Sequence, residues 1–189
     1  ISNCRPVQKS FSDRIRSFFG VEPDTSFHPP NPIEGKKTLI LDMDETLIHS
    51  ADDPPDDKEI SYFPVGDPIF YVYKRPGLDK FLKFCCRKFD TFIFTSGERE
   101  YAEPILNHIC PFIDDNHRLY RDLCETNTGK VKKNLSIFQR PKKDLILIDD
   151  NIAAIENNPQ NAIRIRRWRS NKNDKFLTCW LPPILEKCA

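Results

Sequence analysis

The sequence lacks the features that mark membrane and secreted proteins. No apolar run approaches the roughly 20 residues that a helix needs to cross a bilayer, and the first ten residues do not have the charged-then-apolar layout of a signal peptide. These absences favour a soluble protein without a membrane partner. Because the chain begins at Ile1, we expect its natural start to lie further upstream.

The sequence also lacks the cysteine and histidine spacings of disulfide frameworks and zinc sites. Seven cysteines are scattered over 189 residues, are odd in number and never stand in C-x-x-C spacing. The four histidines have no metal-ligand spacing either. We therefore expect a reducing compartment and assign no histidine to a functional site.

A strong charge of one sign is absent as well. The 29 basic and 28 acidic side chains give a net charge of +1, so no global field recruits nucleic acid or an anionic membrane. The basic run at 164–169 fits either a grip on nucleic acid or an acidic partner, or an edge strand with solvated arginines, and we favour the edge strand. We expect no direct nucleic-acid partner.

The pattern along the chain predicts an N-terminal arm followed by one domain. Residues 1–35 combine a short amphipathic helix around 11–19 with a proline-rich stretch at 23–32, which cannot remain helical. The remaining residues, 36–189, are enough for a single domain with a sizeable core. We expect this domain to be a monomer.

Apolar strands alternate with helical patterns in this domain. The predicted strands are 38–41, 91–95, 145–149 and 162–165, and the predicted helices are 77–88, 98–109 and a segment from about 174 whose apolar positions include Trp180. This succession predicts an α/β fold with a central parallel sheet and right-handed crossovers.

An insert at about 51–73 interrupts the alternation. Its acidic part, 52–59, contains prolines and no following loop glycine, which favours a solvated loop over a calcium loop. Two short β-like runs, 60–65 and 69–73, flank a Gly66-Asp67-Pro68 turn and predict a small antiparallel hairpin. Its aromatic side chains either pack its own face or recognise a substrate.

Two carboxylates and a hydroxyl follow the first buried strand. Asp42, Asp44 and Thr46 stand in an Asp-x-Asp-x-Thr pattern directly after 38–41. Ligands of open α/β sheets gather beyond the carboxyl ends of parallel strands, so these side chains lie at the expected ligand end. Such a set suits phosphoryl transfer, which needs a nucleophile, a proton donor and neutralisation of the phosphoryl oxygens.

The other strand ends supply the remaining groups. Thr95, Ser96 and the amides that follow open a helix and are suited to a phosphoryl oxygen. Asp149 and Asp150 offer the oxygen ligands that Mg²⁺ prefers. One lysine of the segment 129–135 can supply a point charge, so the pattern predicts Mg²⁺-assisted phosphoryl transfer.

The order of these motifs resembles the haloacid-dehalogenase superfamily. The motifs are Asp42-Met43-Asp44-Glu45-Thr46, Phe94-Thr95-Ser96, Val131-Lys132-Lys133-Asn134-Leu135-Ser136 and Asp149-Asp150. More narrowly, the chain is similar over about 36–185 to the small carboxy-terminal-domain phosphatases, the group named for the NLI-interacting-factor domain. The resemblance implies a haloacid-dehalogenase-like Rossmannoid domain with a small hairpin insert and no large cap.

The resemblance also implies roles for the strand-end residues. Asp42 would be the nucleophile that forms an aspartyl-phosphate, and Asp44 the general acid and then the general base. Mg²⁺ would be held by the Asp42 carboxylate, the Asp44 backbone carbonyl and Asp150. The remaining expected roles are phosphate binding by Thr95, Lys133, Ser96 and Arg121, support of the metal by Asp149, and support of the loop backbone by Thr46.

The implied activity is hydrolysis of protein phosphoserine or phosphothreonine in an extended phosphopeptide segment. The heptad-repeat tail of RNA polymerase II is one candidate substrate, and the nucleus is the expected compartment. Two alternatives stay open. The same fold could hydrolyse a small phosphometabolite, or it could be a binding module that has lost turnover.

Overall fold

The computed structural model of the chain describes residues 27–127 and 129–189. The amphipathic helix expected around 11–19 and the first part of the proline-rich stretch lie outside these residues. Residues 27–37 contain no helix or strand. No helix in the described ranges is long and apolar enough to cross a membrane.

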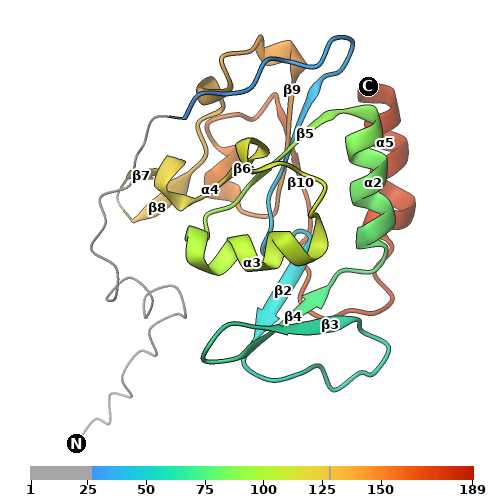
Figure 1. Cartoon of the computed structure of the whole chain (residues 1–189). Coiled ribbons are helices and arrows are strands. Elements are labelled where there is room, and N and C mark those ends of the chain that lie inside the picture. The colour runs from blue at the N-terminus through green and yellow to red at the C-terminus, as the bar shows by residue number, and fades with distance from the viewer. Residues whose placement is uncertain (1–26, 128) are drawn as a thin grey trace, which may run out of the picture.

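A five-stranded parallel sheet forms the centre of the domain (Figure 1). Its strands, in spatial order, are β10 (Ala162–Arg164), β9 (Leu145–Asp149), β1 (Thr38–Leu41), β5 (Asp90–Phe94) and β6 (Arg118–Leu119). In register, Leu41 is opposite Ile93 on one side and Ile148 on the other. The residues that follow β1, β5 and β9 therefore meet at one edge, and the predicted parallel sheet is confirmed.

The side chains of β1 alternate between the two faces of the sheet. Leu39 and Leu41 belong to a core with α2 (Leu78–Lys88), α3 (Arg99–Ile109) and α5 (Leu181–Cys188). Ile40 belongs to a second core with aromatic side chains of β5 and of the 3₁₀ segment η3 (Leu135–Phe138). A central strand covered on both faces is continuously apolar, as this one is.

The two amphipathic helices end close to where their patterns predict. Gly77, with φ 83°, precedes α2 in a left-handed conformation that glycine adopts without strain, and Arg87 and Lys88 complement the dipole in its last turn. Figure 1 shows α2 and α5 side by side on one side of the sheet.

The remaining short elements are η1 (Asp115–His117), η2 (Arg121–Leu123), β7 (Glu125–Asn127), β8 (Lys130–Lys132), η4 (Lys142–Asp144) and α4 (Ile152–Ile155).

The insert forms a three-stranded antiparallel sheet. The predicted hairpin is present as β3 (Tyr62–Val65) and β4 (Phe70–Lys74), and β2 (Ile48–Ala51) pairs with β4 on its other side. The third strand was not predicted, because Ile48-His49-Ser50-Ala51 is short and only half apolar. Between β1 and α2 the described chain contains no helix, so no helical cap covers the carboxyl end of the sheet.

Two C-terminal predictions need correction. The helix expected from about 174 consists of a π-helical turn, η5 (Phe176–Trp180), followed by α5. The wider π turn changes the angular position of the residues that follow it, and Trp180, expected on the apolar face, is 66% exposed. The edge strand expected over 164–169 ends at Arg164. The next residues cross the carboxyl edge of the sheet, where Trp168 N–H donates to the Glu45 carbonyl at 2.8 Å.

Candidate active site

The carboxyl edge of the sheet contains a cavity of about 90 Å³, here called the central cavity. It is lined by Asp42, Asp44, Glu45, Ser96, Val131, Lys133, Asp149, Asp150, Asn151, Ala154 and Arg167. Side chains from the ends of β1, β5, β8 and β9 thus converge on one small volume. Among the predicted site residues, Thr46, Thr95 and Arg121 do not line it.

The loop after β1 places two carboxylates at this cavity. Met43 is fully buried, and its carbonyl accepts the N–H groups of Leu47 at 2.8 Å and Ile48 at 3.2 Å. Glu45 has φ 61°, a left-handed conformation that a non-glycine residue adopts at a cost of about 1–3 kcal/mol. This tight turn keeps the Met43 side chain in the core while Asp42 and Asp44, on either side of it, line the cavity.

Lys133 joins two of the acidic residues. Its Nζ donates to Asp42 Oδ1 and to Asp149 Oδ2, both at 2.6 Å. The Lys133 side chain is 2% exposed, and the side chains of Asp42 and Asp149 are 7% and 1% exposed. Burial alone would lower the pKa of Lys133, but the two carboxylates raise it above its usual value, so this lysine is a fixed positive charge.

The segment after β8 is held in place by two side-chain hydrogen bonds. Asn134 Oδ1 accepts the Ser136 N–H at 2.9 Å and caps η3. Asn158 Nδ2 donates to the Lys133 carbonyl at 2.8 Å. These contacts explain why Lys133, rather than its neighbour Lys132, reaches the central cavity.

Asp42 and Asp44 have different electrostatic environments. Burial raises the pKa of Asp42, while the ammonium of Lys133 opposes this effect. Burial also raises the pKa of Asp44, to about 6, against the hydrogen bond from Tyr101. Asp44 can therefore hold or release a proton near neutral pH, as a group that acts first as acid and then as base must do.

Tyr101 is a site residue that the sequence did not predict. Its hydroxyl donates to Asp44 Oδ1 at 2.5 Å, and the Ser50 hydroxyl lies 2.6 Å from the same Tyr101 oxygen. Because the Tyr101 proton is directed to Asp44, Ser50 is the donor in the second bond. One signal in the sequence is the position of Tyr101 in the helix that follows the Thr95-Ser96-Gly97 motif.

The turn after β5 brings Thr95 close to the two carboxylates. The buried Thr95 hydroxyl accepts the Gly97 N–H at 2.9 Å and lies 3.5 Å from Asp44 Oδ2. A Cβ at Gly97 would lie 2.9 Å from the Tyr101 ring and 3.2 Å from the Thr95 hydroxyl. Only glycine fits this turn without displacing them.

Arg121 and Thr46, two other predicted residues outside the central cavity, lie close to it. The Arg121 guanidinium donates to the Ser96 carbonyl at 3.2 Å and lies 3.4 Å from Glu98. Thr46 is buried, and its carbonyl accepts from Arg75 at 2.8 Å. The Thr46 hydroxyl has no hydrogen-bond partner among the described residues, so the hydrogen bonds that Thr46 forms with them are made by its backbone.

Three carboxylates could hold a divalent cation. One oxygen from each of Asp42, Asp149 and Asp150 lies within 4.8 Å of the others. Oxygens on opposite sides of a single Mg²⁺ are about 4 Å apart, so this set fits a hard cation. Asp149, which the sequence placed in a supporting role, belongs to the cluster itself. Binding through the Asp44 carbonyl stays a prediction.

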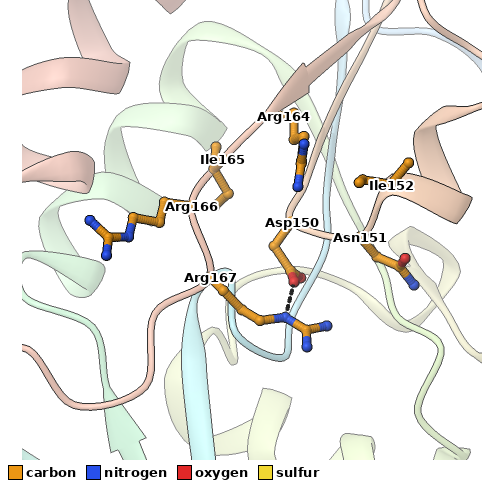
Figure 2. A pocket seen from close by; sticks show the side chains of 7 residues that line it. All are labelled: Asp150, Asn151, Ile152, Arg164, Ile165, Arg166 and Arg167. Carbon is orange, nitrogen blue, oxygen red and sulfur yellow. Dashed lines mark hydrogen bonds and ion pairs between the residues drawn. The ribbon is translucent and has the colours of Figure 1, made fainter.

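Arg167 also reaches the site, although the sequence placed it on a solvated edge strand. Its Nε donates to Asp150 Oδ2 at 2.6 Å (Figure 2). Arg167 follows a parallel strand, β10, that ends at the same edge as β1 and β9. The strand predicted at 162–165 was the sequence signal that could have pointed to this edge, but the contact with Asp150 depends on the tertiary structure.

Two larger cavities adjoin the central one. The insert-side cavity, of about 460 Å³, shares Asp44, Glu45 and Ser96 with it and also contains Phe70, Tyr101 and Arg121. The arginine cavity, of about 630 Å³, shares Asp150, Asn151 and Arg167 with it. The three cavities form a row across the carboxyl edge of the sheet.

The fold of the chain is similar to that of a solved phosphatase structure. The chain aligns with the structure of fission yeast RNA polymerase II CTD phosphatase Fcp1-R271A bound to beryllium fluoride with a TM-score of 0.57 and 24% identity, covering 70% of this chain and 42% of that one. The likeness confirms the predicted haloacid-dehalogenase-like fold.

Two sequence relatives are closer in identity. The chain is 35% identical over 161 residues to "Probable C-terminal domain small phosphatase" of Dictyostelium discoideum, covering 78% of this chain and 49% of the relative. It is 36% identical over 160 residues to "Phosphatase PSR1" of Saccharomyces cerevisiae, covering 79% and 36%. The chain thus spans half or less of the length of these relatives.

A family model matches nearly all of the domain. The model, described as NLI interacting factor-like phosphatase, covers residues 37–189. This range begins just before β1 and includes every residue that lines the central cavity. The chain therefore belongs to the NLI interacting factor-like phosphatase family.

Proposed function

We propose that the chain is a Mg²⁺-dependent phosphatase of protein phosphoserine and phosphothreonine. The observation that carries this proposal is the central cavity, in which Asp42 and Asp44 meet the buried ammonium of Lys133 and a second pair of carboxylates. A nucleophile, a group that titrates near neutral pH and a fixed positive charge are thereby placed within one volume large enough for a phosphoryl group.

The proposed reaction has two halves. A carboxylate oxygen of Asp42 attacks phosphorus, the bond between phosphorus and the serine or threonine oxygen breaks, and Asp44 gives its proton to that oxygen. Asp44, now ionised, then takes a proton from water, whose oxygen attacks the phosphorus of the aspartyl-phosphate. Inorganic phosphate leaves, and the Asp42 carboxylate is restored.

The surrounding residues neutralise charge and orient the reacting groups. Lys133 offsets negative charge on the phosphoryl oxygens, and its bonds to Asp42 and Asp149 fix its position. A Mg²⁺ ion held by Asp42, Asp150 and, as we propose, the Asp44 carbonyl would add further neutralisation of that charge. Thr95 and Ser96 are the proposed donors to the phosphoryl group, and Tyr101 orients Asp44.

The open row of cavities favours a peptide over a small metabolite. A large lid would close around a small metabolite, whereas the insert here is a three-stranded sheet beside the insert-side cavity. An extended segment can cross such a cleft. The names of the relatives make the RNA polymerase II C-terminal domain a candidate substrate, and we propose nuclear residence on that basis.

A side-by-side assay tests this function. Phosphate release is measured from serine and threonine phosphopeptides and from sugar phosphates, each with and without Mg²⁺. We expect Mg²⁺-dependent release from the peptides at a kcat/KM well above that for the sugars. Faster hydrolysis of the sugars would favour a metabolite phosphatase, and peptide binding without release would favour a silent binding module.

A further inference from the structure

The arginine cavity is a positively charged pocket beside the proposed reaction centre. It is lined by Asp150, Asn151, Ile152, Arg164, Ile165, Arg166 and Arg167. Figure 2 shows these side chains around the strand end, with the dashed bond between Arg167 and Asp150. Three arginines and a single carboxylate, that of Asp150, line this cavity, and Asp150 is already bonded to Arg167.

The other two guanidinium groups have no counter-charge among the described residues. In the part of the chain that the structure describes, neither the Arg164 nor the Arg166 side chain forms an ion pair or a side-chain hydrogen bond. Most of the other described arginines are paired with a carboxylate, namely Arg75, Arg99, Arg118, Arg121, Arg140, Arg167 and Arg169. The excess positive charge of the arginine cavity is thus local and uncompensated.

The opposite end of the row has the reverse charge. The insert-side cavity contains the carboxyl groups of Asp44, Glu45 and Asp52 and a single arginine, Arg121, and Glu45 is 3.4 Å from Arg169 outside the cavity. A peptide that crosses the central cavity would therefore meet a positive field on the β10 side and a negative field on the insert side. This difference in charge favours one orientation of a substrate with an asymmetric charge distribution.

We infer that the arginine cavity is a subsite for a second anionic side chain of the substrate, near the phosphoserine or phosphothreonine that reacts. This inference rests on the proposed function. Arginine presents a planar fork of donors that matches phosphate and carboxylate oxygens, and clusters of arginine are a common way to recognise phosphorylated or acidic peptides. A second phosphate, with more charge and more acceptor oxygens than a carboxylate, is the better match.

The spacing of residues in an extended peptide substrate is consistent with this role. The arginine cavity and the central cavity share Asp150, Asn151 and Arg167, so the two bound groups would be separated by one shared wall. An extended peptide advances about 3.3 Å per residue. A second anionic residue a few positions from the reacting one can therefore enter the subsite.

The test compares singly and doubly phosphorylated peptides. One reacting phosphoserine is kept fixed, and a second phosphoserine is placed at each of the four positions on either side, with alanine and glutamate at the same positions as references. For the unmodified protein we expect the best doubly phosphorylated peptide to exceed its alanine reference in kcat/KM by about tenfold. The glutamate peptide is expected to fall between them, since it offers charge without the phosphate geometry.

The matched variants are Arg164→Gln/Arg166→Gln and Lys80→Gln/Lys83→Gln, which remove two positive charges from the arginine cavity and from the exposed side of α2, respectively. In the arginine variant the preference in kcat/KM for the doubly phosphorylated peptide over its alanine reference should fall below about twofold. Turnover of p-nitrophenyl phosphate should stay unchanged. The lysine variant should keep the full preference. The inference is overturned if the unmodified protein prefers the doubly phosphorylated peptide at no position, or if both variants lose that preference equally.

Two further measurements separate this inference from the proposed function. Mg²⁺-dependent turnover of p-nitrophenyl phosphate tests catalysis without the subsite, and fluorescence anisotropy of labelled peptides on the Asp42→Asn protein tests the subsite without catalysis. Tighter binding of the doubly phosphorylated peptide that depends on Arg164 and Arg166 supports the subsite even without turnover. If an RNA oligonucleotide of equal charge displaces that peptide with equal affinity, the cavity is a general polyanion site and the inference fails.

Discussion

The ammonium nitrogen of Lys133 lies 2.6 Å from Oδ1 of Asp42, although the two residues are 91 positions apart in the chain. The same nitrogen lies 2.6 Å from Oδ2 of Asp149, and all three side chains are buried. The position of Lys133 between the two carboxylates has two consequences for the proposed reaction. It keeps a positive charge where a phosphoryl group would lie, and it compensates carboxylates that would be costly to bury alone.

The first prediction concerns the nucleophile. Asp42→Asn replaces an attacking carboxylate oxygen by an amide of the same shape, so kcat for a phosphopeptide should fall by about 10³-fold or more. Circular dichroism should show an unchanged fold. Turnover close to that of the unmodified protein would rule out Asp42 as the nucleophile.

Asp44→Asn is the companion variant. It should leave little turnover, because the amide cannot give a proton to the leaving oxygen or take one from water. With a substrate whose leaving group needs no protonation, phosphoenzyme should accumulate, and mass spectrometry of the quenched protein should detect it. Fast release of phosphate in this variant would show that another group is the acid and base.

The second prediction concerns the buried ion cluster and Mg²⁺. Lys133→Met leaves two carboxylates without their cation, and the free energy of unfolding should fall by about 3–5 kcal/mol when Mg²⁺ is removed by chelation. Adding Mg²⁺ should restore more stability to this variant than to the unmodified protein, because the ion would neutralise the same carboxylates. Denaturant unfolding with and without Mg²⁺ measures both effects.

Lys132→Met is the matched control, since it removes a neighbouring lysine that does not line the central cavity. Its effect on unfolding should stay within about 0.5 kcal/mol. Similar losses in the two variants would mean that the cluster has no special role in stability.

The third prediction concerns the hydrogen bond from Tyr101 to Asp44. Burial raises the pKa of Asp44 to about 6, and the Tyr101 hydroxyl acts in the opposite direction. Tyr101→Phe removes that donor, so the pKa of Asp44 should rise. The pH profile of kcat should then shift upward, by roughly 0.5–1 unit for the loss of one hydrogen bond.

Tyr62→Phe, on an exposed position of β3, is the control for this profile. It should leave the profile unchanged. If both variants have the same profile as the unmodified protein, Tyr101 does not influence the proton on Asp44.

The fourth prediction concerns stability at acid pH. Burial alone would raise the pKa of Asp90, but hydrogen bonds from His117 at 3.0 Å and Arg140 at 2.6 Å hold it below its usual value. A lowered pKa in the folded state contributes stability above the unfolded pKa of about 3.9, and this contribution is lost as the pH falls through the folded value.

Asp90→Asn should therefore be less stable than the unmodified protein at pH 7, by about 1–3 kcal/mol. The difference should shrink as the pH falls below about 4. Denaturant unfolding at pH 7 and at pH 3 measures it. If the free energies of unfolding of the two proteins differ by the same amount at both pH values, the charge of Asp90 contributes nothing to stability.

The sequence by itself determined the sheet and the position of the carboxylates. The buried strands are short, apolar and separated by amphipathic helices, and these patterns arise from local chemistry that a sequence shows directly. The residues after each strand follow from the same pattern, because parallel strands place their carboxyl ends at one edge. Asp42, Asp44, Thr95 and Asp150 could be named for this reason.

Only the tertiary structure decided the contacts between distant segments. Tyr101 reaches Asp44 because α3 packs beside the loop after β1, and Arg167 reaches Asp150 because the chain after β10 crosses the edge of the sheet. The π turn before α5, which exposes Trp180, likewise left no periodic signal. Hydrophobic patterning determines which face of an element is buried, whereas the partner of each polar side chain depends on how the elements pack against one another.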